Sequence, residues 1–232
     1  PGSGEIGRLA VGGRQPIGYY KDPEKSARTF FEVDGKRYSC PGDFATIDAA
    51  LERTAREFGR LDVVVANAGV GYSLPVGRGK FELVRQTIDT DLTGAIATLE
   101  FALPRLRAQG GGQLVAVTSV AASRGMPFMG AYSAAKAGLH RYVQALRAEV
   151  RHEPIVVTEL APGYIDTDMN RMVKNRPFVI PLERGGAIMA RLIERGVGRR
   201  HVPAWPWALL APLNKPMPTR LLAPPPRKQR GS

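Results

Sequence analysis

The stretch Gly59-Arg-Leu-Asp-Val-Val-Val-Ala-Asn-Ala-Gly69 decides the fold. Gly59 ends a helical pattern, and residues 61–66 form a short, mainly apolar run that is rich in valine. Such a run is typical of a β-strand that is buried on both faces, as in parallel sheets covered by helices. Small and polar residues, Asn67 to Gly69, follow where this strand is expected to end. The stretch therefore predicts an α/β protein.

The alternation of helix and strand continues on both sides of this stretch. Apolar residues from Ile47 to Phe58 follow helical spacing before it, and the sequence after it predicts helices over 81–108 and 131–151. Two further buried strands are predicted over 113–118 and 155–160. Parallel strands need crossover connections, so this order predicts βαβ units and a parallel sheet. Ligands of such sheets bind beyond the carboxyl ends of the strands.

Small and polar residues follow each predicted strand. Asn67-Ala68-Gly69 follows the first strand, Ser119 the second, and Pro162-Gly-Tyr-Ile-Asp-Thr167 the third. Between the last two strands lie Tyr132 and Lys136, which share one helix face because they are four positions apart. The ordered set, rather than any single member, indicates a catalytic site.

This set resembles the motifs of the short-chain dehydrogenase/reductase family over residues 47–205. The matching motifs are Gly59 to Gly69, Val117-Thr-Ser119, Tyr132-x-x-x-Lys136 and Pro162-Gly-x-x-x-Thr167. The resemblance implies a Rossmann-like doubly wound parallel sheet and an NAD(P)-dependent oxidoreductase. Such an enzyme transfers hydride between a nicotinamide cofactor and a carbonyl or secondary alcohol. We expect NADP or NAD as the cofactor, with NADP favoured, a small and lipophilic substrate, and a homo-oligomer.

The resemblance also implies a role for each residue. Hydride reduction leaves an alkoxide that needs a proton and hydrogen-bond donors, so Tyr132 would be the general acid and Ser119 would bind the substrate oxygen. Lys136 would lower the pKa of Tyr132 and hold the cofactor ribose. Thr167 and the backbone near Ile165 would hold the carboxamide. The expected cofactor-binding residues are Asn67, Ala68, Gly69, Tyr132, Lys136, Pro162, Gly163, Ile165 and Thr167.

Asp91 departs from the family pattern. The family has an Asn-x-x-Gly motif in the helix after the first of these strands, and Asp91-Leu-Thr-Gly94 occupies that place. We count Asp91 among the catalytic residues, although the carboxylate adds a charge and lacks the amide donor.

The first βαβ unit, with its glycine-rich phosphate turn, is atypical or missing. The nearest candidate contains Gly12, Gly13, Pro16 and Gly18, and proline removes one backbone N–H from it. Residues 1–46 instead resemble a segment of adenylate-forming acyl-CoA synthetases, in which the residue matching Asp43 binds the ATP ribose. Asp34-Gly35 within this segment predicts a hairpin turn.

Two interpretations follow from this N-terminal segment. The chain is either an active reductase with a fused or chimeric N-terminus, or a catalytically impaired remnant that no longer binds a dinucleotide. Its expected organisation is an atypical segment 1–46, a reductase core 47–205 and a proline-rich basic tail 206–232.

The net charge of +12 belongs to the C-terminal part of the chain. Residues 1–170 hold 20 basic and 19 acidic side chains, whereas residues 171–232 hold 13 and 2. This distribution argues against a nucleic-acid partner. The apolar segment from His201 to Leu210 would be either a peripheral membrane anchor or acyl-substrate lid, or a substrate-side or subunit contact.

The remaining reactive residues do not suggest a metal site or a disulfide. Cys40 is the single cysteine, and His140, His152 and His201 lack metal-ligand spacing. No run of about 18 apolar residues is present. We expect a cytoplasmic protein without a metal.

Overall fold

The structure is a computed structural model. It describes residues 43–167 and 176–213, together with residues 11–12, 30–33, 36–39, 169, 173, 218 and 220, and it describes side chains from residue 47 onward except that of Pro212. The chain divides into two compact units, Pro1–Arg60 and Leu61–Ser232, which we call the N-terminal and C-terminal units. Each is described separately.

The described residues of the N-terminal unit form a small antiparallel sheet and helix α2. Strand β1 (Val11–Gly12) pairs with β3 (Lys36–Ser39), which also pairs with β2 (Phe30–Val33). Val33 lies opposite Lys36, so two residues connect the strands and the predicted hairpin is confirmed. Helix α2 (Asp43–Phe58) confirms the helix that was predicted from the apolar spacing.

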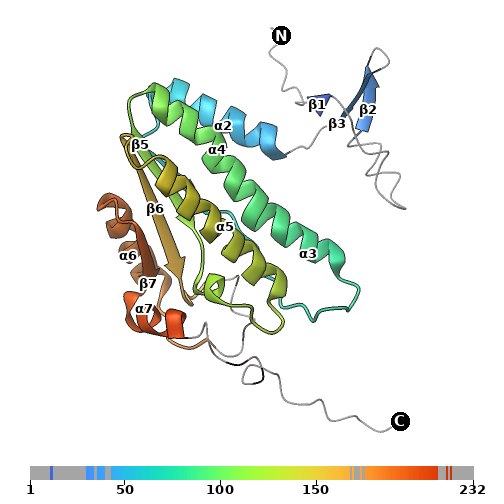
Figure 1. The fold of residues 1–232 in the computed structure, drawn as a ribbon, viewed down its shortest axis with the longest axis vertical. Helices are drawn as coiled ribbons and strands as arrows, with labels where there is room; N and C mark the ends of the chain where they lie inside the picture. Colours follow the sequence, from blue (N-terminus) through green and yellow to red (C-terminus); the bar gives the residue numbers. More distant parts are fainter. Residues whose placement is uncertain are drawn as a thin grey trace. The chain divides into compact units, whose positions relative to one another are not determined.

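The C-terminal unit is built on a parallel sheet of order β4-β5-β6-β7. Strands β4 (Val63–Ala66), β5 (Gly112–Val117) and β6 (Ile155–Pro162) confirm the three predicted strands, and β7 (Arg199–Val202) was not predicted. Because all four strands run the same way, their carboxyl ends meet at one edge of the sheet (Figure 1).

Helices connect these strands. Residues 81–108 form one helical stretch, as predicted, made of α3 (Phe81–Ile88), a π-helix (Asp89–Gly94) and α4 (Ala95–Ala108). Helix α5 (Gly130–Glu149) precedes β6, and α4 and α5 lie side by side over β5 and β6 (Figure 1). The C-terminal part adds a 3₁₀ turn after β5 (Val120–Ser123), α6 (Leu182–Glu194) and α7 (Ala204–Leu213).

The core lies between these two helices and the sheet. Leu99 and Leu106 of α4 and Leu139 of α5 are fully buried, as are Leu114 of β5 and Leu160 of β6, and α4 packs against β5 and α5 against β6. Burying each leucine contributes roughly 2 kcal/mol. This packing fixes α5, and therefore the residues on its inward face, relative to the strand ends.

Strand β4 differs from the prediction of burial on both faces. Val64 and Ala66 are buried, but Val63 is 44% and Val65 42% exposed. The strand is at one edge of the described parallel sheet, and α4 packs against it on one side. The apolar run therefore predicts the strand correctly, but it predicts more burial than the strand has.

The folded C-terminal unit extends past the expected core boundary at residue 205. Helix α7 spans that position, and Trp207 and Ala211 within it are buried. The first compact unit ends at Arg60, and the expected boundaries at residues 46 and 205 stay predictions.

Candidate functional site

The carboxyl edge of the sheet brings the predicted residues together. Asn67 to Gly69 follow β4, Ser119 follows β5, and residues 162–167 lie at and beyond the end of β6. Helix α5 adds Tyr132 and Lys136 from its first two turns. The geometry at this edge is that expected of a ligand site in a parallel α/β sheet.

A buried ion pair joins the π-helix to α5. The Nζ atom of Lys136 lies 3.2 Å from Oδ2 of Asp91, and both side chains are almost completely buried. Lys136 also donates a hydrogen bond to the carbonyl oxygen of Val117 at 3.1 Å, while Oδ1 of Asp91 accepts one from the backbone N–H of Val70 at 2.7 Å. Burial raises the pKa of Asp91, and the charge of Lys136 opposes that rise. Asp91 therefore connects the loop after β4 to α5.

Gly69 passes directly over this ion pair. A Cβ atom at Gly69 would lie 3.2 Å from Oδ2 of Asp91 and 3.4 Å from Nζ of Lys136. A side chain here would press on the carboxylate of Asp91 and contact the ammonium group of Lys136, so glycine permits the close approach of the loop. Asn67 and Ala68, in contrast, are exposed at the end of β4.

Tyr132 lies on the same face of α5 as Lys136. The Nζ atom of Lys136 is 5.8 Å from the centre of the Tyr132 ring. The pKa of Tyr132 is raised, chiefly by burial; a hydrogen bond with Ser119 lowers it, and the charge of Asp91 and the nearby Tyr164 raise it. The pKa of Tyr132 is therefore above its ordinary value rather than lowered as expected, because burial outweighs the contribution that lowers it.

Ser119 is a buried residue that shapes the turn after β5. Its Oγ atom accepts a hydrogen bond from the backbone N–H of Ala121 at 3.1 Å and lies 3.4 Å from the carbonyl oxygen of Pro162, to which it donates. The first contact caps the 3₁₀ turn at its amino end. Ser119 thus has both a structural role and a hydroxyl next to Tyr132.

The end of β6 is covered by a tryptophan that the sequence motifs did not single out. The backbone N–H of Gly163 donates to the carbonyl oxygen of Val202 at 2.9 Å, and a Cβ at Gly163 would lie 2.1 Å from Nε1 of Trp207. Trp207 also packs edge-on against Phe178, with ring centres 5.8 Å apart. The segment from His201 to Leu210 therefore belongs partly to the site wall: Trp207 is buried, whereas Trp205 is 74% exposed.

Ile165 and Thr167, expected near the carboxamide, have different surroundings. Ile165 is buried and forms a parallel bridge with Ile180, and it packs in an apolar cluster with residues of α6. Thr167 is half-buried. The side chain of Ile165 is therefore enclosed by this cluster.

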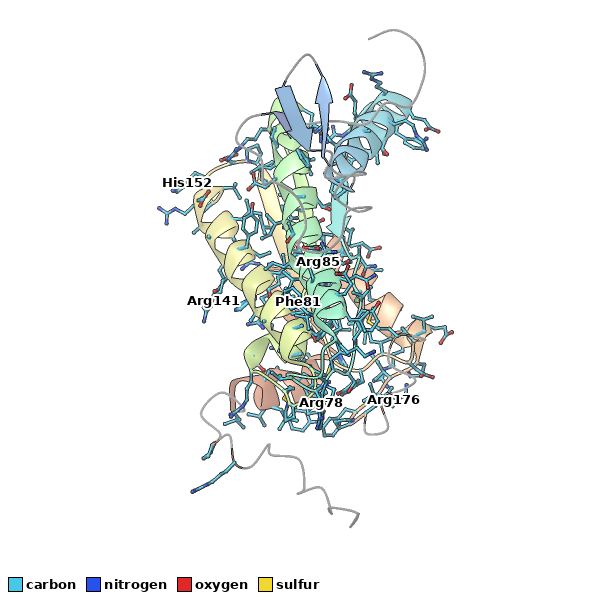
Figure 2. All side chains as sticks on the ribbon, turned by 90° about the vertical axis from the view of Figure 1, so that its right-hand side faces the viewer. Arg78, Phe81, Arg85, Arg141, His152 and Arg176 are labelled. Carbon is cyan, nitrogen blue, oxygen red and sulfur yellow. The ribbon has the colours of Figure 1, made fainter. Side chains whose placement is uncertain are left out.

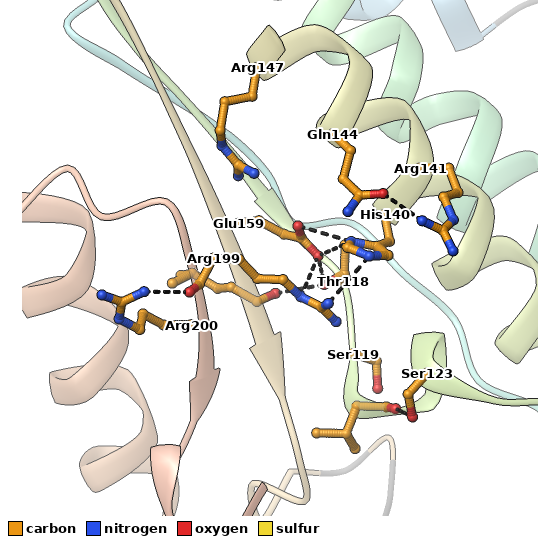
Figure 3. A network of polar contacts seen from close by, with 12 residues as sticks. Thr118, Ser119, Ser123, His140, Arg141, Gln144, Arg147, Glu159, Arg199 and Arg200 are labelled. Carbon is orange, nitrogen blue, oxygen red and sulfur yellow. Dashed lines mark hydrogen bonds and ion pairs between the residues drawn. The ribbon is translucent and has the colours of Figure 1, made fainter. Parts of the chain in front are cut away.

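A second buried polar cluster lies further along α5 (Figure 3). Glu159, fully buried on β6, accepts hydrogen bonds from Thr118 at 3.0 Å and from Nδ1 of His140 at 2.8 Å, and lies 3.2 Å from Nε of Arg199. Nε2 of His140 faces Nη1 of Arg199 at 3.3 Å, so a neutral ring can donate to Glu159 and accept from Arg199. Burial lowers the pKa of His140, and Glu159 opposes this. Sequence spacing alone did not indicate this cluster.

Metal and membrane features were also sought in the structure. Across the described residues, no group of three or more His, Cys, Asp or Glu side chains could hold a metal ion. None of the helices in the described part of the chain is both long and apolar enough to span a membrane.

Comparison with known proteins identifies the family. The family model described as short chain dehydrogenase matches residues 26–177. The chain therefore belongs to the short chain dehydrogenase family. This match begins inside the segment 1–46 for which we noted a resemblance to acyl-CoA synthetases, and that second resemblance stays a prediction.

Several relatives share this similarity. An uncharacterized oxidoreductase of Mycobacterium tuberculosis is 36% identical over 180 residues, which cover 77% of this chain and 71% of the relative. One of Myxococcus xanthus is 38% identical over 174 residues, covering 73% and 68%.

Solved structures agree with the fold. A short chain dehydrogenase from Burkholderia cenocepacia in complex with NADP has a TM-score of 0.67 and 25% identity, covering 78% of this chain and 77% of that one. Carveol dehydrogenase from Mycobacterium avium in complex with NAD has a TM-score of 0.53 and 32% identity, covering 55% of this chain. The match spans about half of that protein, 47% of its length.

The described site fits the nicotinamide end of a dinucleotide. The backbone at Gly69 passes close to the buried pair of Asp91 and Lys136. The ammonium group of Lys136 has three N–H donors, of which one bonds to Val117, and it pairs with Asp91, so it has the donors to hold a ribose hydroxyl as well. The glycines considered for a phosphate turn lie outside the described residues, apart from the backbone of Gly12, which pairs with Tyr38 in β3.

Proposed function

We propose that this protein transfers hydride between a nicotinamide cofactor and a carbonyl or secondary alcohol, with Tyr132 as the proton donor and acceptor. The observation that carries this proposal is the position of Tyr132 beside Ser119 and one helical turn from the buried Lys136–Asp91 pair. Membership of the short chain dehydrogenase family supports it. Relatives in complex with NAD or NADP support the choice of cofactor class.

Each residue has a chemical task in this proposal. The bound cofactor supplies or accepts the hydride. The hydroxyl of Tyr132 donates a proton to the developing alkoxide oxygen, and the hydroxyl of Ser119 hydrogen-bonds to the same oxygen. Lys136 holds the ribose through its remaining N–H, and Asp91 positions Lys136 and the loop at Val70. Asp91 is thus a positioning residue.

The protonation state of Tyr132 favours carbonyl reduction at neutral pH. Because burial raises the pKa of Tyr132, the phenol remains protonated and ready to donate. Alcohol oxidation needs the phenolate as a base and would therefore require a more alkaline solution.

Residues at the end of β4 and β6 would hold the rest of the nicotinamide. Gly69 permits close approach, and the backbone near Ile165 together with Thr167 would bind the carboxamide, as the family resemblance implies. We propose NADP rather than NAD as the preferred cofactor; a comparison of turnover with NADPH and NADH tests this choice.

Cofactor-coupled turnover of a panel of ketones tests the function. We expect the wild-type chain to oxidise NADPH with at least one ketone and Tyr132→Phe to lose most of this activity, by a factor of about 100 or more. Tyr142→Phe, which alters a tyrosine bonded to Glu100 elsewhere on α5, is the matched control. Equal rates for wild type and Tyr132→Phe would contradict the assignment.

The alternative, a remnant that binds no dinucleotide, is tested directly. Titration with NADPH, followed by its fluorescence, should show saturable binding in the micromolar range. The nucleotide-bound relatives do not favour this alternative. Absence of NADPH binding together with absence of ketone turnover would establish this alternative.

We also propose a homo-oligomer in the cytoplasm that acts on a small lipophilic substrate. The single cysteine supports a reducing compartment. Light scattering coupled to size-exclusion chromatography tests the oligomeric state, and liposome co-sedimentation tests peripheral membrane contact through the exposed Trp205 and Leu209. Limited proteolysis tests the expected segments 1–46, 47–205 and 206–232.

A further inference from the structure

A largely apolar pocket lies between the loop after β4 and the segment that leads into α5. Its volume is about 350 Å³, which is within the usual range for small-molecule sites. The backbone N–H of Leu74 donates to the carbonyl oxygen of Phe128 at 2.7 Å and ties the two walls together. The apolar side chains in the lining are Leu74, Pro75, Val76, Phe81, Val84 and Phe128. We call this the loop pocket.

Each wall of the loop pocket contains a residue that is close in sequence to the proposed site. Ala131 lines it and immediately precedes Tyr132 on α5. Tyr72 lines the other wall, three residues after Gly69, and its hydroxyl is bonded to Gln86 of α3 at 3.1 Å. A molecule in this pocket therefore lies beside the end of α5 that carries Tyr132.

Two cations also line the loop pocket. Arg78 and Lys80 are exposed, and no acidic residue lies between Tyr72 and Phe81. In the part of the chain that the structure describes, neither has an ion-pair partner. Figure 2 shows Arg78 beyond Phe81, at the end of the C-terminal unit away from His152.

Other arginines near this end of the unit are already paired. Arg85 contacts Glu82 and Asp89, and Arg176 lies 2.6 Å from Asp166. Arg78 and Lys80 differ from these arginines, because neither is paired within the described residues and both line an apolar pocket. An apolar cavity with two cations matches a molecule with an apolar body and an anionic group.

We propose that the loop pocket binds the apolar chain of an amphiphilic carbonyl substrate, whose carboxylate or phosphate pairs with Arg78 and Lys80. This inference rests on the proposed function, because it assigns a substrate class to the same site. The carbonyl reacts at Tyr132, and the anionic group remains at the loop.

Two ketones that differ in the charge of one end test whether Arg78 and Lys80 bind an anionic group. We expect 9-oxodecanoate to have a lower KM than its uncharged methyl ester, and the double variant R78Q/K80Q to remove this difference by raising the KM for the acid about tenfold. kcat should change little, and the KM for the ester should stay the same. R151Q, at an exposed arginine bonded to His152, is the matched control. Equal KM values for acid and ester in the wild type would overturn the proposal.

A binding measurement keeps this test independent of turnover. Calorimetric titration with decanoate, which has no ketone, should give a dissociation constant about tenfold higher in R78Q/K80Q than in the wild type. Butyrate should bind more weakly than decanoate, and Phe81→Ala should reduce this preference for the longer chain. If neither R78Q/K80Q nor Phe81→Ala affects the binding of decanoate, the proposal is refuted, even if the chain reduces ketones. If the wild type binds decanoate but reduces no ketone, the proposed function is refuted instead.

Discussion

Lys136 and Asp91 form a buried ion pair, with Nζ and Oδ2 3.2 Å apart, at the point where α5 meets the π-helix. The family pattern has an amide at the position of Asp91, so this chain carries an additional negative charge beside its proposed proton donor. Burial is the main cause of the raised pKa of Tyr132, and the charge of Asp91 raises it further.

The variant Asp91→Asn tests this electrostatic effect. Removal of the negative charge should lower the pKa of Tyr132, because Asp91 raises it. In the direction of alcohol oxidation, the rise of kcat with pH should therefore occur at a lower pH than in the wild type. Asp89→Asn, two residues earlier and exposed, should leave the profile unchanged. An unchanged profile in Asp91→Asn would show that Asp91 does not influence Tyr132.

Loss of one partner of the ion pair should reduce stability. Lys136→Met leaves the carboxylate of Asp91 buried without its counter-charge, which typically costs about 3 kcal/mol. The double variant D91N/K136M should recover part of this loss, because no charge is left buried. Urea denaturation of the single and double variants measures the coupling. Strictly additive losses would mean that the two charges do not stabilise each other.

The contact between Gly163 and Trp207 predicts a steric effect. A Cβ at residue 163 would lie 2.1 Å from Nε1 of Trp207, so Gly163→Ala should displace α7 and cost about 2 kcal/mol of unfolding free energy. Tryptophan fluorescence should change as Trp207 becomes more exposed.

A glycine of α6 provides the control for this experiment. A Cβ at Gly186 would meet no atom within 4 Å, so Gly186→Ala should be neutral or stabilise the protein by about 0.5 kcal/mol. Equal losses in both variants would show that the effect does not come from Trp207.

The cluster around Glu159 predicts a pH dependence of stability. Burial lowers the pKa of His140 in the folded protein below its ordinary value of 6.5, so the unfolded chain binds more protons as the pH falls. Stability is then fully present above pH 6.5 and decreases as the pH falls below it. His201, whose pKa burial also lowers, contributes in the same direction.

Thermal unfolding between pH 5 and 8 measures this dependence. His140→Gln should make the curve flatter, since one of the two histidines with a lowered pKa no longer titrates. His152→Gln, which changes an exposed histidine, should retain the slope of the wild type. A slope that is equal in His140→Gln and wild type would contradict the assignment to His140.

Local patterns were enough to predict much of the C-terminal unit. The valine-rich run before Asn67 and the helical spacing over residues 81–108 predicted β4 and the helical stretch from α3 to α4. These predictions succeeded because strand and helix periodicity follow from residues close together in the chain. Strand β7 is short and basic, with the sequence Arg199-Arg-His-Val202, so it has no apolar run that would mark it.

The sequence by itself determined the class of fold and the residue types of the site, because ordered motifs placed Ser119, Tyr132 and Lys136 at successive strand ends and on one helix face. The electrostatics of these residues depend on the tertiary structure. Burial, with a smaller contribution from the charge of Asp91, raises the pKa of Tyr132, and Trp207 packs on Gly163 at the end of β6. Such effects depend on distances between segments far apart in the chain, which no local pattern contains.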